Sequence, residues 1–215
     1  MNRIDQITGN GKKFFVAYYT AGFPTVAASG AILDTLVESG CDLIELGYPF
    51  SDPTADGPTI QASSQTALEN GFTRAGYFQL LQEFRERHPD VPAVVFSYYN
   101  PIFQYGIEKF VEFAKAAGAD GMLVVDLPHE EQADVRAVLD RQGLHLIQLI
   151  APTTGLERTG EILKNATGFV YQISLRGVTG VRDTIATDAG ENIARTRALT
   201  ELPIALGFCV GTGEQ

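Results

Sequence analysis

Two carboxylates in contrasting surroundings stand out in this sequence, Glu45 and Asp56. Glu45 lies inside an apolar, β-prone stretch (LIELG), whereas Asp56 lies in the following run of Pro, Asp, Gly, Ser and Thr, which is typical of a loop. A carboxylate within a buried strand is costly unless it is paired or used. Because different surroundings push two carboxyl pKa values apart, one group can act as an acid and the other as a base. The residues also fit a satisfied core glutamate beside a solvated loop aspartate.

Two further stretches contain residue types suited to binding a substrate. Residues 176–183 (RGVTGVRD) place Thr179 and Gly180 in a glycine-rich loop, which could close over a substrate or be a plain surface loop. Residues 207–213 (GFCVGTG) begin with Gly207 and Phe208 at the end of an apolar run. Backbone N–H groups in such a stretch can bind phosphate, although the glycines could also serve only to ease strand closure.

Aromatic side chains fall within several of the apolar runs, among them Tyr18, Phe96 and Tyr171. Most aromatic residues in such runs belong to the core of a protein. Several together could instead line a pocket for a flat, apolar substrate.

The composition limits the class of partner and the compartment. A formal net charge of −10 argues against binding to nucleic acid or to an acidic membrane surface. An anionic substrate is not excluded, because backbone N–H groups bind phosphate without basic side chains. The two cysteines and three histidines show no metal-ligand spacing, so we expect no metal site. The N-terminal stretch lacks the apolar core of a signal peptide and no stretch is long enough to span a bilayer, so we expect a cytoplasmic protein.

Seven apolar, β-prone segments alternate with segments of helical periodicity. The predicted strands are residues 14–19, the segment that carries Glu45, and residues 93–99, 121–127, 144–150, 168–174 and 203–210. The predicted helices span residues 25–39, 60–70, 74–87, 107–118, 130–141, 156–165 and 191–199. Since the strands are continuous apolar runs, we expect parallel strands covered on both faces, in an α/β fold.

The residues that follow the predicted strands favour a (β/α)8 barrel of the TIM type over a doubly wound open sheet. Polar side chains follow nearly every strand, and a barrel places its active site on that rim. No G-x-G-x-x-G follows the first strand, which weakens the dinucleotide-binding version of the open sheet.

A complete barrel of this type has eight strands and about 250 residues. We therefore expect residues 1–215 to form a single barrel domain that is incomplete at its C-terminal end and lacks the eighth βα unit. Either the chain is truncated or one strand is missing from the count. An open barrel edge would expose unpaired backbone groups and favour association.

The motif at residues 45–58, ELGYPFSDPTADGP, closely resembles the signature of the tryptophan synthase alpha subunit family. Shorter matches follow one another in the same order, at YTAG (19–22), VVDLP (124–128), GVTG (177–180) and GF (207–208). The resemblance covers nearly the whole chain. It implies a (β/α)8 barrel that cleaves indole-3-glycerol phosphate to indole and glyceraldehyde 3-phosphate, in tryptophan biosynthesis.

The resemblance also implies roles for individual residues and a partner. Glu45 would protonate the indole ring carbon, and Asp56 would accept a hydrogen bond from the indole N–H. The residues expected at the substrate are Tyr171, Thr179 on the closing loop, Gly180, Gly207 and Phe208. The chain itself would hold no cofactor, and its partner in a heterotetramer would be the PLP-containing beta subunit, which receives indole through a tunnel.

The sequence departs from the family pattern near its end. The family usually has Gly-Phe-Gly-Ile-Ser where this chain has Gly-Phe-Cys-Val-Gly, so Cys209 replaces a glycine whose N–H faces the phosphate. Weaker phosphate binding would follow. Because the eighth strand is missing, one alternative function is a catalytically weak subunit that binds and activates a beta subunit. Another is a different phosphate-sugar barrel enzyme, but a Schiff-base aldolase is disfavoured because no lysine falls at a predicted strand end.

Overall fold

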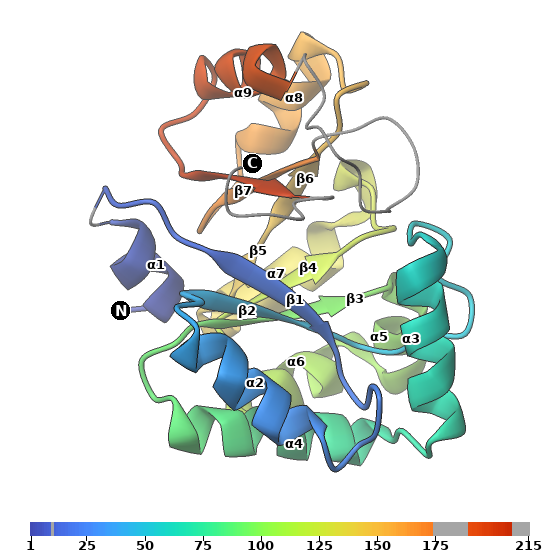
Figure 1. Ribbon diagram of the computed structural model, residues 1–215. Coiled ribbons are helices and arrows are strands. Elements are labelled where there is room, and N and C mark those ends of the chain that lie inside the picture. The colour runs from blue at the N-terminus through green and yellow to red at the C-terminus, as the bar shows by residue number, and fades with distance from the viewer. Residues whose placement is uncertain (10, 174–188, 208–215) are drawn as a thin grey trace.

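The computed structural model describes residues 1–9, 11–173 and 189–207, and all its strands are parallel. Neighbouring strands in the chain are neighbours in space, in the orders β1-β2-β3-β4-β5 and β6-β7-β8 (Figure 1). The strands are β1 (Val16–Thr20), β2 (Leu43–Gly47), β3 (Ala93–Ser97), β4 (Gly121–Val124), β5 (His145–Leu146), β6 (Gln148–Ile150), β7 (Val170–Ile173) and β8 (Ile204–Gly207).

The predicted strand at residues 144–150 is present but divided at Ile147 into β5 and β6. The first half pairs with β4, and the second half pairs with β7. The Ile147 N–H still donates to the Met122 carbonyl on β4 at 2.9 Å. This one extended segment therefore joins the two sheets into a succession of seven strands, as the sequence predicts.

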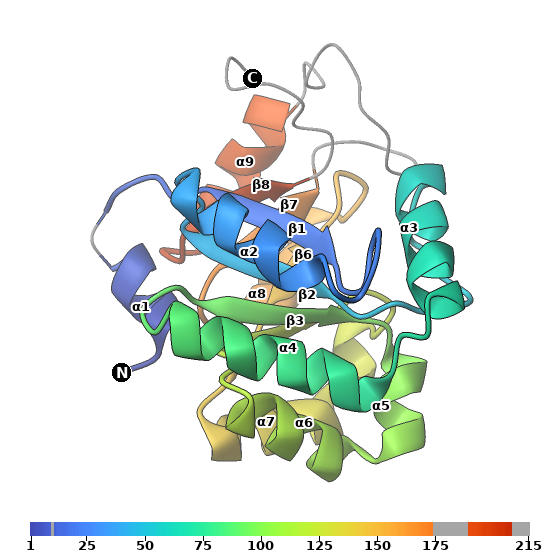
Figure 2. The same ribbon diagram turned by 60° about the horizontal axis from the view of Figure 1, so that its bottom comes forward.

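Side chains on opposite faces of the strands belong to separate hydrophobic cores. The inner cluster includes Leu43, Phe96 and Leu123, which point into the barrel, while alternate residues such as Ile44 and Val95 face the surrounding helices. The outer layer (Figures 1 and 2) contains α2 (Ser29–Glu38), α3 (Pro58–Glu69), α4 (Arg74–Arg87), α6 (Ile107–Ala116), α7 (Ala133–Gln142), α8 (Leu156–Leu163) and α9 (Ala189–Arg197). This is the barrel-type α/β architecture that the alternation predicts.

Three details of the predicted elements are wrong. The strand expected at residues 93–99 ends at Ser97, and α5 (Tyr99–Tyr105) follows, because Pro101 in a first helical turn loses no hydrogen bond. A short helix, α1 (Arg3–Thr8), forms in the polar N-terminal stretch, where the Asn2 side chain caps it by accepting from the Ile4 N–H. The helix expected at 130–141 is present as α7, but it begins only at Ala133, after a 3-10 turn, η1 (His129–Glu131).

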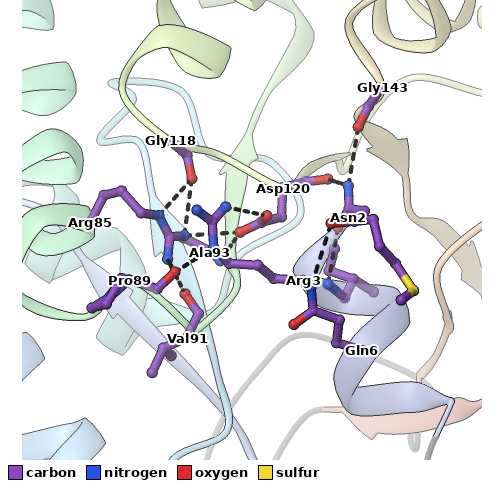
Figure 3. Close-up of polar contacts among 12 residues, drawn as sticks. Asn2, Arg3, Gln6, Arg85, Pro89, Val91, Ala93, Gly118, Asp120 and Gly143 are labelled. Atoms are coloured by element: carbon purple, nitrogen blue, oxygen red, sulfur yellow. Dashed lines mark hydrogen bonds and ion pairs between the residues drawn. The ribbon is translucent and has the colours of Figure 1, made fainter.

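An ion-pair network around Asp120 closes the amino-terminal end of the barrel (Figure 3). The buried Asp120 carboxylate lies 2.9 Å from Arg3 Nη1 and 2.9 Å from Arg85 Nη2, and it also accepts the Ala93 N–H at 3.0 Å. Asn2 Nδ2 donates to the Asp120 carbonyl at 2.7 Å. The network ties α1, α4 and the start of β3 together and leaves the opposite, carboxyl-terminal end of the strands available for a site.

In the described part of the chain, β1 pairs only with β2 and β8 only with β7, so both are edge strands. A helix able to cross a membrane does not occur in these ranges either.

Candidate active site

Glu45 lies on the inner face of β2 and is only 2% exposed. Its Oε1 atom has no hydrogen-bond partner among the described residues, and burial raises the pKa of the carboxyl group to about 8. A buried carboxyl without a partner is expensive to ionise. Near neutral pH Glu45 therefore holds its proton and can donate it.

Asp56 lies at the end of the loop that follows β2, directly before Gly57, the N-cap of α3. Burial raises the pKa of its carboxyl group, while the hydrogen bond donated by Tyr98 opposes that rise. Tyr98 Oη lies 2.9 Å from Asp56 Oδ2 and itself accepts the Ala55 N–H at 3.0 Å. Asp56 thus has a hydrogen-bond partner for its charged form, whereas Glu45 Oε1 has none in the part of the chain that the structure describes.

Glu45 and Asp56 both line one large cavity of about 1110 Å³. Its walls include the aromatic rings of Tyr18, Phe96 and Tyr171, and it extends to Gly207 at the end of β8. Both predicted catalytic residues, the three predicted aromatic residues and Gly207, which the sequence predicts near the phosphate, therefore line the same cavity. An apolar cavity with two convergent carboxyl groups suits a flat substrate with one polar edge.

Gly207 has a packing role in addition to any contact with a ligand. A Cβ atom on Gly207 would lie 2.0 Å from Cζ of Tyr171, so the Tyr171 ring occupies the space of a side chain there. Thr179, Gly180 and Phe208 lie outside the described residues, and the roles expected for them stay predictions.

Several polar residues that follow the strands hold the rim together. Thr20 Oγ1 lies 2.8 Å from Ser63 Oγ on α3, and Asp126 Oδ1 accepts the Tyr99 N–H at 2.7 Å. Thr154 Oγ1 accepts the Ala151 N–H at 3.2 Å. The polar residues that follow the strands therefore serve two purposes: some line the cavity, and several others hold the loops in place by hydrogen bonds.

The sequence does not identify Tyr98 as the hydrogen-bond partner of Asp56. Sequence reasoning also missed Gly47, which lies two residues after Glu45 on the same face of β2. Glycine inside a strand indicates a close approach of another group, and that signal was available for Gly47. Metal ligands in groups of three or more are absent from the described ranges.

Comparison with known proteins identifies the family. The model of the family described as tryptophan synthase alpha chain matches residues 4–215. The tryptophan synthase alpha chain of Methanosarcina mazei is 45% identical over 213 residues, covering 99% of this chain and 77% of the relative. That of Caldanaerobacter subterraneus subsp. tengcongensis is 46% identical over 218 residues, covering 100% and 82%.

Solved structures agree with this assignment. A chain from Aquifex aeolicus VF5 superposes with a TM-score of 0.92 at 33% identity, covering 100% of this chain and 83% of that one. A chain from the tryptophan synthase a2b2 complex of Pyrococcus furiosus superposes with a TM-score of 0.87 at 41% identity, covering 94% and 80%. With two carboxyl groups in one aromatic cavity inside a parallel barrel, this chain belongs to the tryptophan synthase alpha chain family.

Proposed function

We propose that Glu45 and Asp56 are the catalytic pair with which this chain cleaves indole-3-glycerol phosphate to indole and glyceraldehyde 3-phosphate, the lyase reaction of its family. The observation that carries the proposal is the position of both groups in one cavity. Glu45 is buried and its Oε1 has no hydrogen-bond partner among the described residues, whereas Asp56 accepts a hydrogen bond from Tyr98. Two carboxyl groups with separated pKa values can divide the work of acid and base.

Glu45 acts first, as a general acid. Its carboxyl proton passes to the indole ring carbon that carries the glycerol side chain, and the ring nitrogen becomes positively charged. The bond between the ring carbon and the side chain then breaks, its electron pair restores the indole ring, and the adjacent hydroxyl becomes the aldehyde. The Glu45 carboxylate accepts that hydroxyl proton, which returns the group to its starting form.

Asp56 acts as the charged partner of the ring nitrogen. Its carboxylate accepts a hydrogen bond from the indole N–H and stabilises the positive charge that develops there. Tyr98 holds Oδ2 at 2.9 Å and so fixes the orientation of the carboxylate before substrate arrives.

The rest of the cavity binds the substrate. Tyr18, Phe96 and Tyr171 provide apolar rings for the flat indole, and Gly207 lies at the end of β8 in the same cavity. Thr179 is proposed to orient Asp56, and Gly180, Gly207 and Phe208 to lie near the phosphate and the indole. These assignments follow from the resemblance at residues 177–180 and 207–208.

We further propose that residues 1–215 form one barrel domain, that the protein is cytoplasmic, and that its partner is a PLP-containing beta subunit. The match of the family model to residues 4–215 supports the first statement. The solved a2b2 complex of the Pyrococcus furiosus relative supports the partner. Fractionation of cells tests the cytoplasmic location, and co-purification with a beta subunit tests the partner.

The direct test is formation of indole from indole-3-glycerol phosphate by the purified chain and by Glu45→Gln and Asp56→Asn. Both variants are expected to lose at least about 100-fold in kcat, since each removes a group that acts on the reacting atoms. Asp52→Asn, an exposed carboxylate in the same loop, is the matched control and is expected to retain activity. Full activity of Glu45→Gln would contradict the proposal.

A further inference from the structure

The ring of Tyr18 packs against Gly47 and fills the space that a side chain at position 47 would occupy. A Cβ atom on Gly47 would lie 2.2 Å from Tyr18 Oη and 2.6 Å from Tyr18 Cζ. Such distances are far below van der Waals contact, so any larger residue at position 47 would displace the ring. Gly47 is therefore a seat for Tyr18, a residue of the neighbouring strand.

The Tyr18 ring crosses β2 to reach β3. In the strand register Tyr18 lies beside Glu45, and Gly47 lies beside Phe96. The Tyr18 and Phe96 rings meet edge to face with their centroids 5.0 Å apart. Since Tyr18 starts on β1 and contacts a ring on β3, its own ring lies over the inner face of β2, next to Glu45.

The exposures of the two side chains agree with this arrangement. Tyr18 is partly exposed and lines the cavity, whereas Glu45 lines the same cavity yet is only 2% exposed. The Thr20 hydroxyl lies 3.4 Å from Tyr18 Oη and 2.8 Å from Ser63 Oγ, which ties the end of the ring to α3. The ring is held in place from two sides.

The same diagonal arrangement occurs once more among the described strands. Tyr171 on β7 lies beside Ala205 on β8 in the register, and its ring fills the space over Gly207, two residues further on. Each of these two units consists of a tyrosine, the residue beside it on the next strand and the glycine under its ring. Ala205 is beside Tyr171 in the second unit, as Glu45 is beside Tyr18 in the first. The chain contains a matched unit with the same ring and glycine but without the carboxyl group.

We propose that Tyr18 is a positioning residue for Glu45: its ring, seated on Gly47 and against Phe96, keeps water away from the Glu45 carboxyl group. The inference deepens the proposed function, and its mechanistic meaning rests on that function. The role belongs to the ring rather than to the hydroxyl, because exclusion of water needs apolar area.

Other ionisable groups around the cavity do not account for the same effect. Asp56 and Tyr98 lie on the loop side, and Tyr171 lies on β7. The other ionisable residues that line the cavity are Lys12, Lys13, Arg197 and Glu201. The raised pKa of Glu45 has burial as its cause. The group that provides this burial is therefore the feature to alter.

The experiment is a direct titration of Glu45 by NMR of protein labelled with carboxyl-¹³C glutamate, with Glu45→Gln used to assign its signal. The parent is expected to titrate near pH 8. Tyr18→Phe keeps the ring and is expected to keep this value, whereas Tyr18→Ala is expected to lower it by about one unit or more. Tyr171→Ala, which opens the matched unit without a carboxyl group, should leave the Glu45 titration unchanged. An unchanged titration in folded Tyr18→Ala would overturn the inference.

Gly47→Ala provides an independent second variant, because it displaces the ring without removing it. It should lower both the melting temperature and the pKa of Glu45. Adding Tyr18→Ala to Gly47→Ala removes the clash, so the double variant should regain melting temperature while its Glu45 titration stays low. Recovery of both properties would count against the role of the ring.

The titration requires no turnover, which separates this inference from the proposed function. A parent protein that titrates as expected but forms no indole would refute the function and leave the shielding intact. In an active parent, the alkaline limit of kcat/KM should move to lower pH in Tyr18→Ala. An alkaline limit unchanged by Tyr18→Ala would refute the inference alone.

Discussion

At the scale of single residues, the two carboxyl groups owe their different chemistry to different surroundings. Glu45 is buried without a hydrogen-bond partner for Oε1 among the described residues, whereas Asp56 accepts a hydrogen bond from Tyr98. Burial raises both pKa values, and the Tyr98 hydroxyl limits the rise only at Asp56. The difference in surroundings therefore favours a protonated Glu45 together with an ionised Asp56.

The raised pKa of Glu45 predicts a dependence of stability on pH. Between the ordinary glutamate value of 4.5 and about 8, the folded state holds a proton that the unfolded state has released. The free energy of unfolding should therefore fall as pH rises through this window and level off above it. Glu45→Gln lacks the effect, so it should become more stable than the parent by a few kcal/mol, on the order of the linkage energy, at about pH 9.

Urea unfolding of both proteins at about pH 5 and pH 9 measures this difference. Asp52→Asn, whose carboxylate is exposed, should follow the parent at both pH values. Equal stability of parent and Glu45→Gln at the higher pH would mean that Glu45 ionises without cost in the folded protein.

Tyr98→Phe should impair the ionised form of Asp56. The variant removes the donated hydrogen bond, so the pKa of Asp56 should rise further, and the acid limit of kcat/KM should move to higher pH. We expect a loss of about tenfold in kcat/KM, the size of one hydrogen bond to a charged group. Tyr105→Phe, outside the cavity, is the control, and an unmoved acid limit in Tyr98→Phe would show that Tyr98 does not act on Asp56.

At the scale of elements, the barrel separates stability from chemistry along the strand axis. Glu45 lies midway along β2 and Asp56 lies in the loop after its carboxyl end, while the Asp120 network with Arg3 and Arg85 lies at the amino ends of the strands. A buried ion pair is costly to break, because the remaining charge stays buried without its partner.

Asp120→Ala should therefore destabilise the protein by about 3 kcal/mol without altering KM for the substrate. The change leaves Arg85 and the Ala93 N–H without their carboxylate partner. Asp34→Ala breaks an ion pair with Arg87 that is partly exposed, so its cost should stay below about 1 kcal/mol. Similar losses for the two variants in urea unfolding would show that the network does not stabilise the barrel end.

The elements could be predicted from the sequence to the extent that their signals are local. All seven strands are continuous apolar runs, and each appears in the structure. The division of one strand at Ile147 depends on the two neighbouring strands, and local sequence does not report it. Asn2, which caps the start of α1, also donates hydrogen bonds to the carbonyls of Asp120 and Gly143, and local sequence does not predict such distant contacts.

In the candidate site, too, the residues with a local signal could be predicted from the sequence, whereas the contacts between elements could not. Glu45 stands out because a carboxylate in an apolar strand contradicts its surroundings. The seat of Tyr18 on Gly47 joins two strands, and the bond between Tyr98 and Asp56 joins a strand end to a loop. Such pairs require the register of the sheet, which the sequence alone does not specify.

At the scale of the whole molecule, one cavity of about 1110 Å³ collects the aromatic rings and both carboxyl groups inside the barrel. The cavity continues between the two edge strands β1 and β8 of the described chain. Its electrostatic character near the reacting atoms comes from Glu45 and Asp56, so the pH dependence of the whole enzyme should report on these two groups.

The measurement that tests the account most directly is the pH profile of kcat/KM for indole-3-glycerol phosphate cleavage. Because Glu45 must be protonated to act, the rate should be highest below about pH 8 and then fall tenfold per pH unit. A rate that instead rises through pH 8 would mean that ionised Glu45 is the active form, and it would contradict the role of Glu45 as the acid that protonates the indole ring.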